Sequence, residues 1–412
     1  MERKSVRILA ISQVYYPDSA SVSQHLTDLL EALSAAGYEV TVFSSSRGYE
    51  DPRKRFPKRE SVNGVTVERI SNTGFGKQNK ASRLIDFLTF NFLILIKLLS
   101  VKRGKFDLLI GMTSPPLLSY LGLKLARLKG LKFIYWAMDL QPELSIVANY
   151  VKSGSWTASI LQKRADFVFN GADKIIALDS FMKDYICERT ANLNDRIDVI
   201  PVWPVISEVY MGDRLSNPFR LENNFRDKIV IMYSGNHSVM HPLTTLLDAA
   251  VRLRHDKRFL FVHIGGGVGL KEVLDCREEH KLLNIITLPY QPRKNIHNSL
   301  GAADIQVVSL GNGCVGFTHP NKVYGSMFIG KPILYIGPSH SHVSEILDKC
   351  EGNIAVEHGD VGGLVEMLDR FSKQSDVKRK LIGENNRRFA QDNFHPKKLI
   401  SDMIASVEKV AF

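Results

Sequence analysis

A lysine that follows a glycine-rich loop is the residue of this sequence best suited to hold a phosphate group. Lys322 comes after a loop that contains Gly311, Gly313 and Gly316, and Asn321 directly precedes it. An ammonium group and backbone amides together neutralise the charge of a departing diphosphate without a metal ion. We therefore predict that this segment stabilises a nucleotide diphosphate as it leaves. The alternative is a solvated lysine on the first turn of a helix.

Two other glycine segments follow strand-like runs. One begins at Gly235, after residues 228–233, and the other at Gly265, after residues 259–264. Glycine lets the backbone approach a diphosphate closely, although such turns also serve tight packing alone. The residues predicted to bind a nucleotide ligand are Ser21, Gly235, Asn236, Gly265, Gly266, Tyr290, Gly313, Asn321 and Lys322.

A polar turn near the start of the chain explains why Ser21 is in this set. Residues 15–21 open the helix that carries His25, and their small side chains lie where a helix N-terminus favours an anion. A serine that caps the helix without any ligand explains the turn almost equally well.

Two carboxylates follow the strand-like run 132–136. Asp139 is suited to hydrogen-bond an acceptor hydroxyl or a sugar ring. Glu143, just after Pro142, is either a second functional carboxylate or a complement to a helix N-terminus. We predict Asp139, Glu143 and Lys322 as the catalytic residues.

Alternating strands and helices must position these groups. Short apolar runs occur in the first half at residues 6–12, 39–44, 65–70, 107–111, 132–136, 174–177 and 197–201. The pattern restarts at residues 228–233, 259–264, 285–288, 305–309, 332–336 and 353–356. This order predicts an α/β protein with two doubly wound, Rossmann-like parallel sheets, whose ligands bind beyond the carboxyl ends of the strands.

The length of 412 residues also favours two domains over one core. Prolines and a polar stretch without a sustained period mark a hinge within residues 201–217. We predict an N-terminal domain over residues 1–205 and a C-terminal domain over residues 206–389, facing each other across a cleft. A final amphipathic helix is predicted over residues 389–410, and residues 390–412 are predicted to pack back on the first domain.

The composition is that of a globular protein, with 44% apolar and 24% charged residues. The four cysteines are far apart and form no Cys-x-x-Cys pair, so neither a disulfide framework nor a thiolate metal site is predicted. A reducing cytoplasm fits this pattern. No signal peptide is expected, because Ser12 and Gln13 break the first apolar run.

The net charge of +11 gathers in the first half, at residues 47–59 and 97–105. These clusters are either a solvated face or a contact with anionic lipid; nucleic acid is disfavoured because no recognised nucleic-acid motif appears. Residues 84–101 are apolar but interrupted by Asp86, Asn91 and Lys97. We predict a buried or membrane-surface helix there and not a membrane span.

These segments, in this order, resemble the retaining GT-B glycosyltransferases of family four, particularly the branch that builds bacterial O-antigen, capsule and colanic-acid-type polysaccharides. The similarity covers nearly the whole chain. The positions that match the family motifs are Pro17, Ala20, Ser21, His25, residues 37–40, Asp139 to Glu143, Gly235-Asn236, Pro320 to Lys322 and residues 330–332.

The chain departs from the family pattern at three places. Many members have two glutamates eight positions apart, whereas the matching positions here are Phe317 and Gly325. The usual Lys-Gly of the second domain is replaced by His241-Pro242, and the paired glycines of the first loop by Ala20-Ser21. The missing glutamates leave open a catalytically silent scaffold of an assembly complex.

The resemblance implies a hexosyltransferase-type enzyme that moves a sugar, with retention, from a nucleotide donor on the second domain to an acceptor on the first. A UDP-sugar is the expected donor, and neither a metal ion nor a cofactor is expected. Acceptors in this branch are commonly lipid-linked saccharides, which fits a cytoplasmic enzyme peripherally bound to the inner face of the plasma membrane. A GT-B nucleotide-sugar epimerase, which needs no acceptor, is the other alternative.

Overall fold

The structure is a computed structural model that describes residues 6–18, 20–49, 51–76, 80–190, 193–206, 209–210 and 212–412. The chain divides into two compact units. The first comprises Met1–Pro201, Gly316–His319 and Lys397–Phe412, and the second comprises Val202–Val315 and Pro320–Pro396. Two short pieces of the C-terminal half therefore belong to the first unit.

The first unit is built on a sheet that has eight strands among the described residues, in the order β3-β4-β2-β1-β5-β6-β7-β8. Neighbouring strands pair in parallel, except that β3 and β4 are antiparallel. The strands are β1 (Arg7–Ile11), β2 (Glu39–Ser45), β3 (Arg59–Val62), β4 (Val65–Ile70), β5 (Leu108–Met112), β6 (Lys132–Trp136), β7 (Lys174–Ala177) and β8 (Ile197–Val199).

Helices connect these strands. They are α1 (Ser21–Ala35), α2 (Lys80–Leu99), α3 (Leu118–Lys129), α4 (Glu143–Val147), α5 (Trp156–Gly171) and α6 (Ser180–Glu188), and α15 (Pro396–Ala411) joins them from Lys397 onward. Helix α1 buries Leu26, Leu30 and Leu33, and Gly37 follows it with a φ of +94°, a conformation that glycine adopts without strain. Within the described residues, no helix combines the length and the apolar character needed to cross a bilayer.

The second unit is built on a parallel sheet that has six strands among the described residues, in the order β11-β10-β9-β12-β13-β14. The strands are β9 (Ile229–Ser234), β10 (Phe259–Ile264), β11 (Ile285–Leu288), β12 (Ile305–Ser309), β13 (Ile333–Ile336) and β14 (Ile354–Val356). The helices are α7 (Pro218–Glu222), α8 (Thr244–Arg252), α9 (Leu270–Glu279), α10 (Ile296–Gly301), α11 (Lys322–Phe328), α12 (His342–Leu347), α13 (Val361–Ser372) and α14 (Asp376–Asn393).

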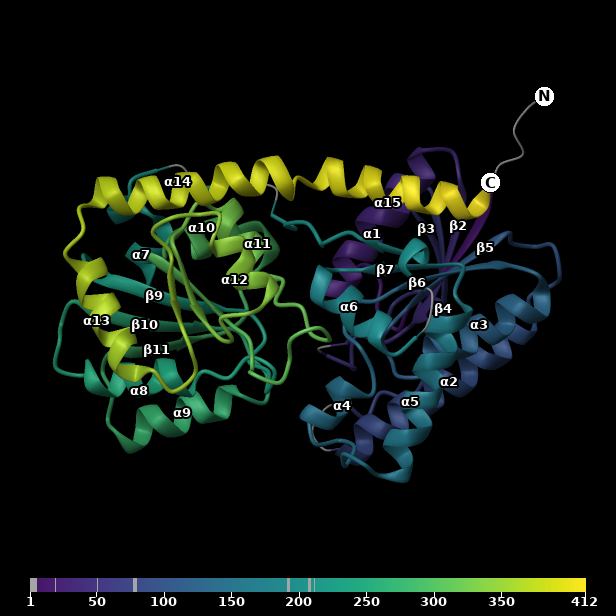
Figure 1. The fold of residues 1–412 in the computed structure, drawn as a ribbon, viewed down its shortest axis with the longest axis horizontal. Coiled ribbons are helices and arrows are strands. Elements are labelled where there is room, and N and C mark those ends of the chain that lie inside the picture. The colour runs from purple at the N-terminus through teal and green to yellow at the C-terminus, as the bar shows by residue number, and fades with distance from the viewer. Residues whose placement is uncertain are drawn as a thin grey trace. The chain divides into compact units, whose positions relative to one another are not determined.

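The central strand β9 shows why this sheet is covered on both faces. Ile231 and Tyr233 belong to the core that α8 and α13 complete, while Val230 and Met232 belong to the core that includes Phe219 of α7. Because alternate side chains of a strand point to opposite faces, a strand buried on both sides is apolar throughout. In Figure 1, α8, α9 and α13 lie along one side of β9, β10 and β11.

The predicted fold class is confirmed, since both units are α/β sheets whose strand order extends in two directions from the first strand. Strand β3 was not predicted, because its sequence Arg-Glu-Ser-Val has no apolar run and it lies at the sheet edge. The predicted final helix covers the end of α14 and nearly all of α15, and Phe394 and His395 interrupt it between the two helices. Residues 207, 208 and 211 of the predicted hinge lie outside the described residues.

Candidate functional site

Lys322 is the first residue of α11 and is a largely buried cation. Its ammonium nitrogen lies 4.8 Å from the centre of the Tyr233 ring. Among the described residues it pairs with no carboxylate, and burial lowers the pKa of Lys322 from 10.5 to about 8. A desolvated ammonium without a counterion favours binding of an anion.

Gly235 is the reason that Lys322 can lie over the end of β9. Gly235 has a φ of +130°, and a Cβ atom there would come within 2.8 Å of the Lys322 Cε. Gly265, at the end of the neighbouring strand β10, is equally close-packed, because a Cβ atom would lie 2.1 Å from the Gly235 carbonyl oxygen. The two predicted glycine segments and the lysine therefore meet at one edge of the second sheet.

Three more of the predicted nucleotide-binding residues belong to this edge. The ring of Tyr290 lies beside both Gly265 and Gly266, where an added Cβ atom would approach it to 3.1 Å, and Tyr290 is 49% exposed. Asn236 lies against Gly267, where an added Cβ atom would come within 2.2 Å of the Asn236 Oδ1. The exposed aromatic ring and the glycine backbone leave a surface on which a flat base or a sugar can pack.

The remaining two predicted residues of the loop before α11 contribute less. Gly313 is exposed, and the space where its side chain would be is open. Asn321 precedes α11, but its side chain makes no capping bond to that helix. The structure therefore brings Lys322, Gly235, Gly265, Gly266 and Tyr290 together and leaves Gly313 at the surface.

Two histidines of the loop after β9 also belong to this site and were not predicted as ligands. His241 donates a hydrogen bond from Nδ1 to the Ser309 carbonyl oxygen at 2.7 Å, which joins the loop after β9 to the last residue of β12. The strand order reverses between these two strands, and ligands of doubly wound sheets bind at that point. Burial, together with Lys322, lowers the pKa of His237 to about 4 and that of His241 to about 3, so both are neutral at pH 7. Their place directly after the first strand of the sheet was the available signal.

Asp139 follows β6 in the first unit. Burial raises the pKa of the Asp139 carboxyl to about 6, and the nearby His319, whose backbone also bonds to this carboxylate, limits that rise. The His319 Nδ1 lies 2.6 Å from the Asp179 Oδ2, and the His319 side chain is fully buried. His319 and Asp179 were not predicted, although His319 lies in the segment before Lys322 that the sequence singled out.

Glu143, the other predicted carboxylate, is held by two partners. Its Oε1 accepts hydrogen bonds from the Tyr185 hydroxyl at 2.6 Å and from the Arg189 guanidinium at 2.8 Å. Glu143 is also the first residue of α4, a position that fits the alternative prediction of a carboxylate complementing a helix N-terminus. These contacts join α4 to α6 and the turn that follows it.

Ser21 and His25 form a pair within α1. The His25 Nδ1 donates to the Ser21 carbonyl oxygen at 2.8 Å, and the His25 side chain is buried. Ser21 itself is exposed at the first turn of the helix, while Ala20 precedes it without a side-chain cap. The turn is thus open to solvent at Ser21, and His25 is satisfied inside the unit.

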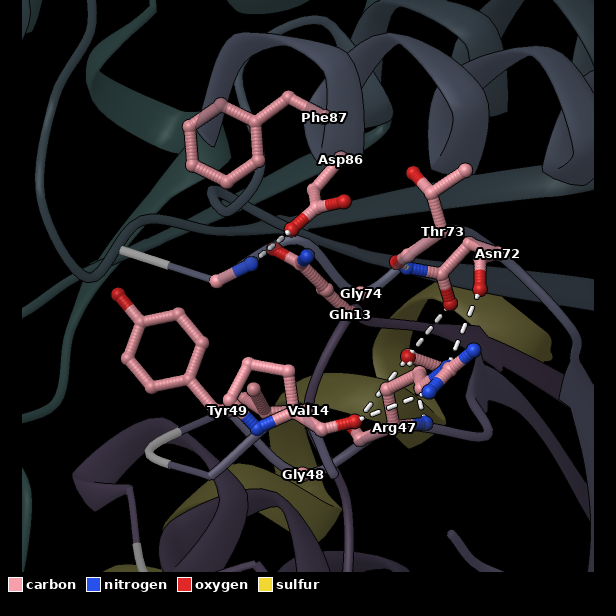
Figure 2. Close-up of a pocket in the computed structure, with 13 residues that line it drawn as sticks. Gln13, Val14, Arg47, Gly48, Tyr49, Asn72, Thr73, Gly74, Asp86 and Phe87 are labelled. Atoms are coloured by element: carbon pink, nitrogen blue, oxygen red, sulfur yellow. Dashed lines mark hydrogen bonds between the residues drawn. The ribbon is translucent and has the colours of Figure 1, made fainter. Parts of the chain in front are cut away.

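The first unit has a hollow at the carboxyl ends of β1, β2 and β4, with about 450 Å³ of space that includes open solvent. Figure 2 shows this hollow with Arg47 on one side and the ring of Phe87 on the other. Its position matches the rule that ligands of parallel sheets lie beyond the carboxyl ends of the strands.

Comparisons with known proteins agree with this organisation. Residues 22–202 match the family described as Glycosyltransferase Family 4. The chain is 25% identical over 302 residues to the probable glycosyltransferase WbjE of Pseudomonas aeruginosa, covering 71% of this chain and 74% of WbjE. It is 23% identical over 377 residues to the putative colanic acid biosynthesis glycosyl transferase WcaI of Escherichia coli (strain K12), covering 87% of this chain and 90% of WcaI.

Solved structures share the fold over nearly the full length. The structure of Alr3699/HepE from Anabaena, in complex with UDP-glucose, has a TM-score of 0.72 and 13% sequence identity, and the match covers 98% of this chain and 99% of HepE. The two α/β units and their similarity to these solved structures agree with the two-domain architecture predicted from the sequence. The chain therefore has the GT-B fold, and its residues 22–202 are similar to glycosyltransferase family 4.

Proposed function

We propose that this protein is a glycosyltransferase of surface polysaccharide biosynthesis, which transfers a hexose from a UDP-sugar, with retention, to a lipid-linked saccharide. The observation that carries the proposal is the largely buried Lys322 beside Gly235 and Gly265. Within the part of the chain that the structure describes, this cation has no counterion, and it lies at the reversal point of a parallel sheet. The names of WbjE and WcaI and the UDP-glucose bound to HepE support the reaction class.

In the proposed reaction, the bond between the sugar C1 and the diphosphate oxygen breaks, and its electron pair stays on the diphosphate. The Lys322 ammonium neutralises that charge. The acceptor hydroxyl forms the new bond to C1, and its proton passes to the diphosphate. Asp139 is the group of the first unit proposed to hydrogen-bond the acceptor, and the contacts of Glu143 favour a supporting role.

The reaction is tested by incubating the purified protein with uridine, guanosine and adenosine diphosphate sugars and a lipid-linked saccharide. The expected result is release of a nucleoside diphosphate, above all UDP, only when the acceptor is present, with a product whose anomeric configuration by NMR equals that of the donor. Release without acceptor would indicate an epimerase or a hydrolase. No release with any combination would refute the proposal.

Peripheral membrane association on the cytoplasmic side is part of the proposal. Helix α2 presents an exposed apolar face, called here the α2 face, which consists of Leu84, Ile85, Leu88, Phe92, Ile96 and Leu99. Each of these side chains is between 45% and 63% exposed. The exposed basic residues Lys102 and Arg103 follow the helix. Such a face with flanking cations matches a helix that lies in an anionic membrane surface.

Cosedimentation with vesicles tests the membrane association. Vesicles rich in phosphatidylglycerol should bind the protein, and high salt should weaken that binding. Leu88→Glu should weaken it roughly tenfold or more, because a buried leucine contributes about 1.5–3 kcal/mol. Leu283→Glu is the matched control, since Leu283 is 91% exposed in the second unit. Equal binding by both variants would count against the α2 face.

A scaffold without catalytic activity is the second candidate, and the positions of the missing glutamates favour it. The Phe317 side chain packs near Tyr185, with ring centres 6.3 Å apart, and the Gly325 backbone lies against Ile206. Neither position offers a carboxylate. Complementation of a deletion strain by Lys322→Ala would support the scaffold, whereas loss of the polysaccharide at normal protein level would support the enzyme.

A further inference from the structure

The lining of the hollow in the first unit indicates how an acceptor could be bound. Its lining comes from the residues after β1, β2 and β4 and from the first turns of α2. In Figure 2, Arg47 and Asn72 lie on one side, and the rings of Tyr49 and Phe87 lie on the other. A polar side and an aromatic side together suit a saccharide, whose hydroxyls need partners and whose ring faces are apolar.

Arg47 is the charged group of this hollow. Its Nη1 donates to the Pro52 carbonyl oxygen at 3.1 Å, and its Nε donates weakly to the Asn72 carbonyl oxygen at 3.4 Å. Among the described residues no carboxylate forms an ion pair with Arg47, and its Nη2 makes no hydrogen bond to them. The carboxylate of Asp86 is already engaged, because it accepts the N–H groups of Phe75 and Gly76. A held guanidinium with unused donors is a site for an anionic group.

Gln13 provides a second unused polar group. Its side chain is only 9% exposed, and its Oε1 accepts no hydrogen bond from the described residues. A buried carbonyl oxygen left without a donor costs free energy, which a ligand hydroxyl would recover. The unused donors of Arg47 and the unused acceptor of Gln13 therefore suit one ligand that carries both an anionic group and hydroxyl groups.

The α2 face adds the apolar part of that ligand. Asp86 and Phe87 line the hollow, while Ile85 and Leu88, their neighbours along the helix, are exposed. The same two turns of α2 therefore border the polar hollow and begin the apolar face. Continuity between these surfaces favours a ligand with a saccharide, an anionic group and a hydrocarbon chain.

We propose that this hollow binds the acceptor, that Arg47 binds the diphosphate joining its saccharide to its lipid, and that the lipid chain lies along the α2 face. The inference rests on the proposed function and names the residue that distinguishes a diphosphate-linked acceptor from a neutral glycolipid. Arg47 acts on binding of the acceptor and takes no part in bond breaking.

The test compares three variants of the full chain. Arg47→Gln removes the charge. Gly74→Ala keeps the charge but moves it, because the new Cβ atom would lie 3.0–3.2 Å from the Arg47 side chain. Arg53→Gln is the matched control, since Arg53 belongs to the same loop, pairs with Asp51 and does not line the hollow.

Equilibrium binding is measured with a saccharide on a short prenyl diphosphate, with the same saccharide on a neutral alkyl chain, and with UDP. Arg47→Gln is expected to weaken binding of the diphosphate ligand by roughly tenfold to a hundredfold, and Gly74→Ala by less. Binding of the neutral ligand and of UDP should stay unchanged in both, and Arg53→Gln should behave like wild type. Short-chain phosphatidylglycerol, added as a competitor, should not displace the diphosphate ligand.

Two results would overturn the inference. One is equal weakening of the diphosphate and neutral ligands, or of UDP, by Arg47→Gln. The other is displacement of the diphosphate ligand by phosphatidylglycerol alone, which would make the hollow a headgroup site. If ligand binding depends on Arg47 but no sugar is transferred, the acceptor site is supported and the proposed reaction is refuted. Failure of the inference can therefore be distinguished from failure of the proposed function.

Discussion

Replacing Lys322 by methionine should stabilise the ligand-free protein. The pKa of Lys322 is about 8 in the folded protein, against an ordinary value of 10.5, because burial disfavours the ammonium. At about 1.36 kcal/mol per pH unit, this difference corresponds to about 3 kcal/mol of cost at pH 7. Lys322→Met removes the charge and keeps the volume, so its free energy of unfolding should exceed that of wild type by up to about 3 kcal/mol.

The pH dependence of this difference has a defined sign. Below pH 8 the side chain is charged in both the folded and unfolded states, and the full burial cost applies. Between pH 8 and 10.5 the folded lysine is neutral while the unfolded one is charged, so unfolding takes up a proton and wild type gains stability as the pH rises. The advantage of Lys322→Met should therefore shrink above pH 8.

Urea denaturation of both proteins at pH 7.0, 8.0, 9.0 and 9.5 measures the difference directly, and comparison of the two cancels the titration of all other groups. A variant that is less stable than wild type at pH 7, or a difference that does not change with pH, would refute the reasoning. The first outcome would mean that Lys322 has a stabilising partner, and the second that its ammonium is solvated.

Three further predictions concern residues around the two candidate sites. Glu143→Gln should lower the free energy of unfolding by about 1–3 kcal/mol, because it weakens the pair with Arg189, and should leave the KM for both substrates unchanged; thermal unfolding and kinetics check this. Gly235→Ala should cost about 1–3 kcal/mol of stability, because of the φ of +130°, and should weaken UDP binding by displacing Lys322, as calorimetry would show. Transfer should accelerate as the pH rises through about 6, where Asp139 loses its proton, and Asp139→Asn should abolish this step in the pH–rate profile.

The sequence predicts the fold well because buried parallel strands are continuous apolar runs. Strands such as β9 and β10 are buried on both faces and stand out from the polar turns around them. The edge strand β3 pairs on one side only and carries charged residues, so its pattern resembles a loop. The break between α14 and α15 was also missed, since amphipathic periodicity continues on both sides of Phe394.

The candidate site is predictable only where function follows from local chain geometry. Gly235, Gly265 and Lys322 each follow a strand or open a helix, and the carboxyl ends of parallel strands bring such residues together. The pairing of His319 with Asp179 joins residues 140 positions apart, which no local pattern encodes. The engagement of Glu143 by Tyr185 and Arg189 depends on the packing of α6 in the same way.

Binding of UDP to the second unit tests the central claim most directly. Isothermal titration at pH 7 would compare wild type, Lys322→Met and Lys331→Met. Lys331 is the matched control, because burial lowers its pKa to about 8 as well, but it lies before β13, at the opposite ends of the strands. We predict that wild type and Lys331→Met bind UDP equally and that Lys322→Met binds it at least roughly tenfold more weakly. Equal binding by all three proteins, or binding by none, would contradict a donor site at Lys322.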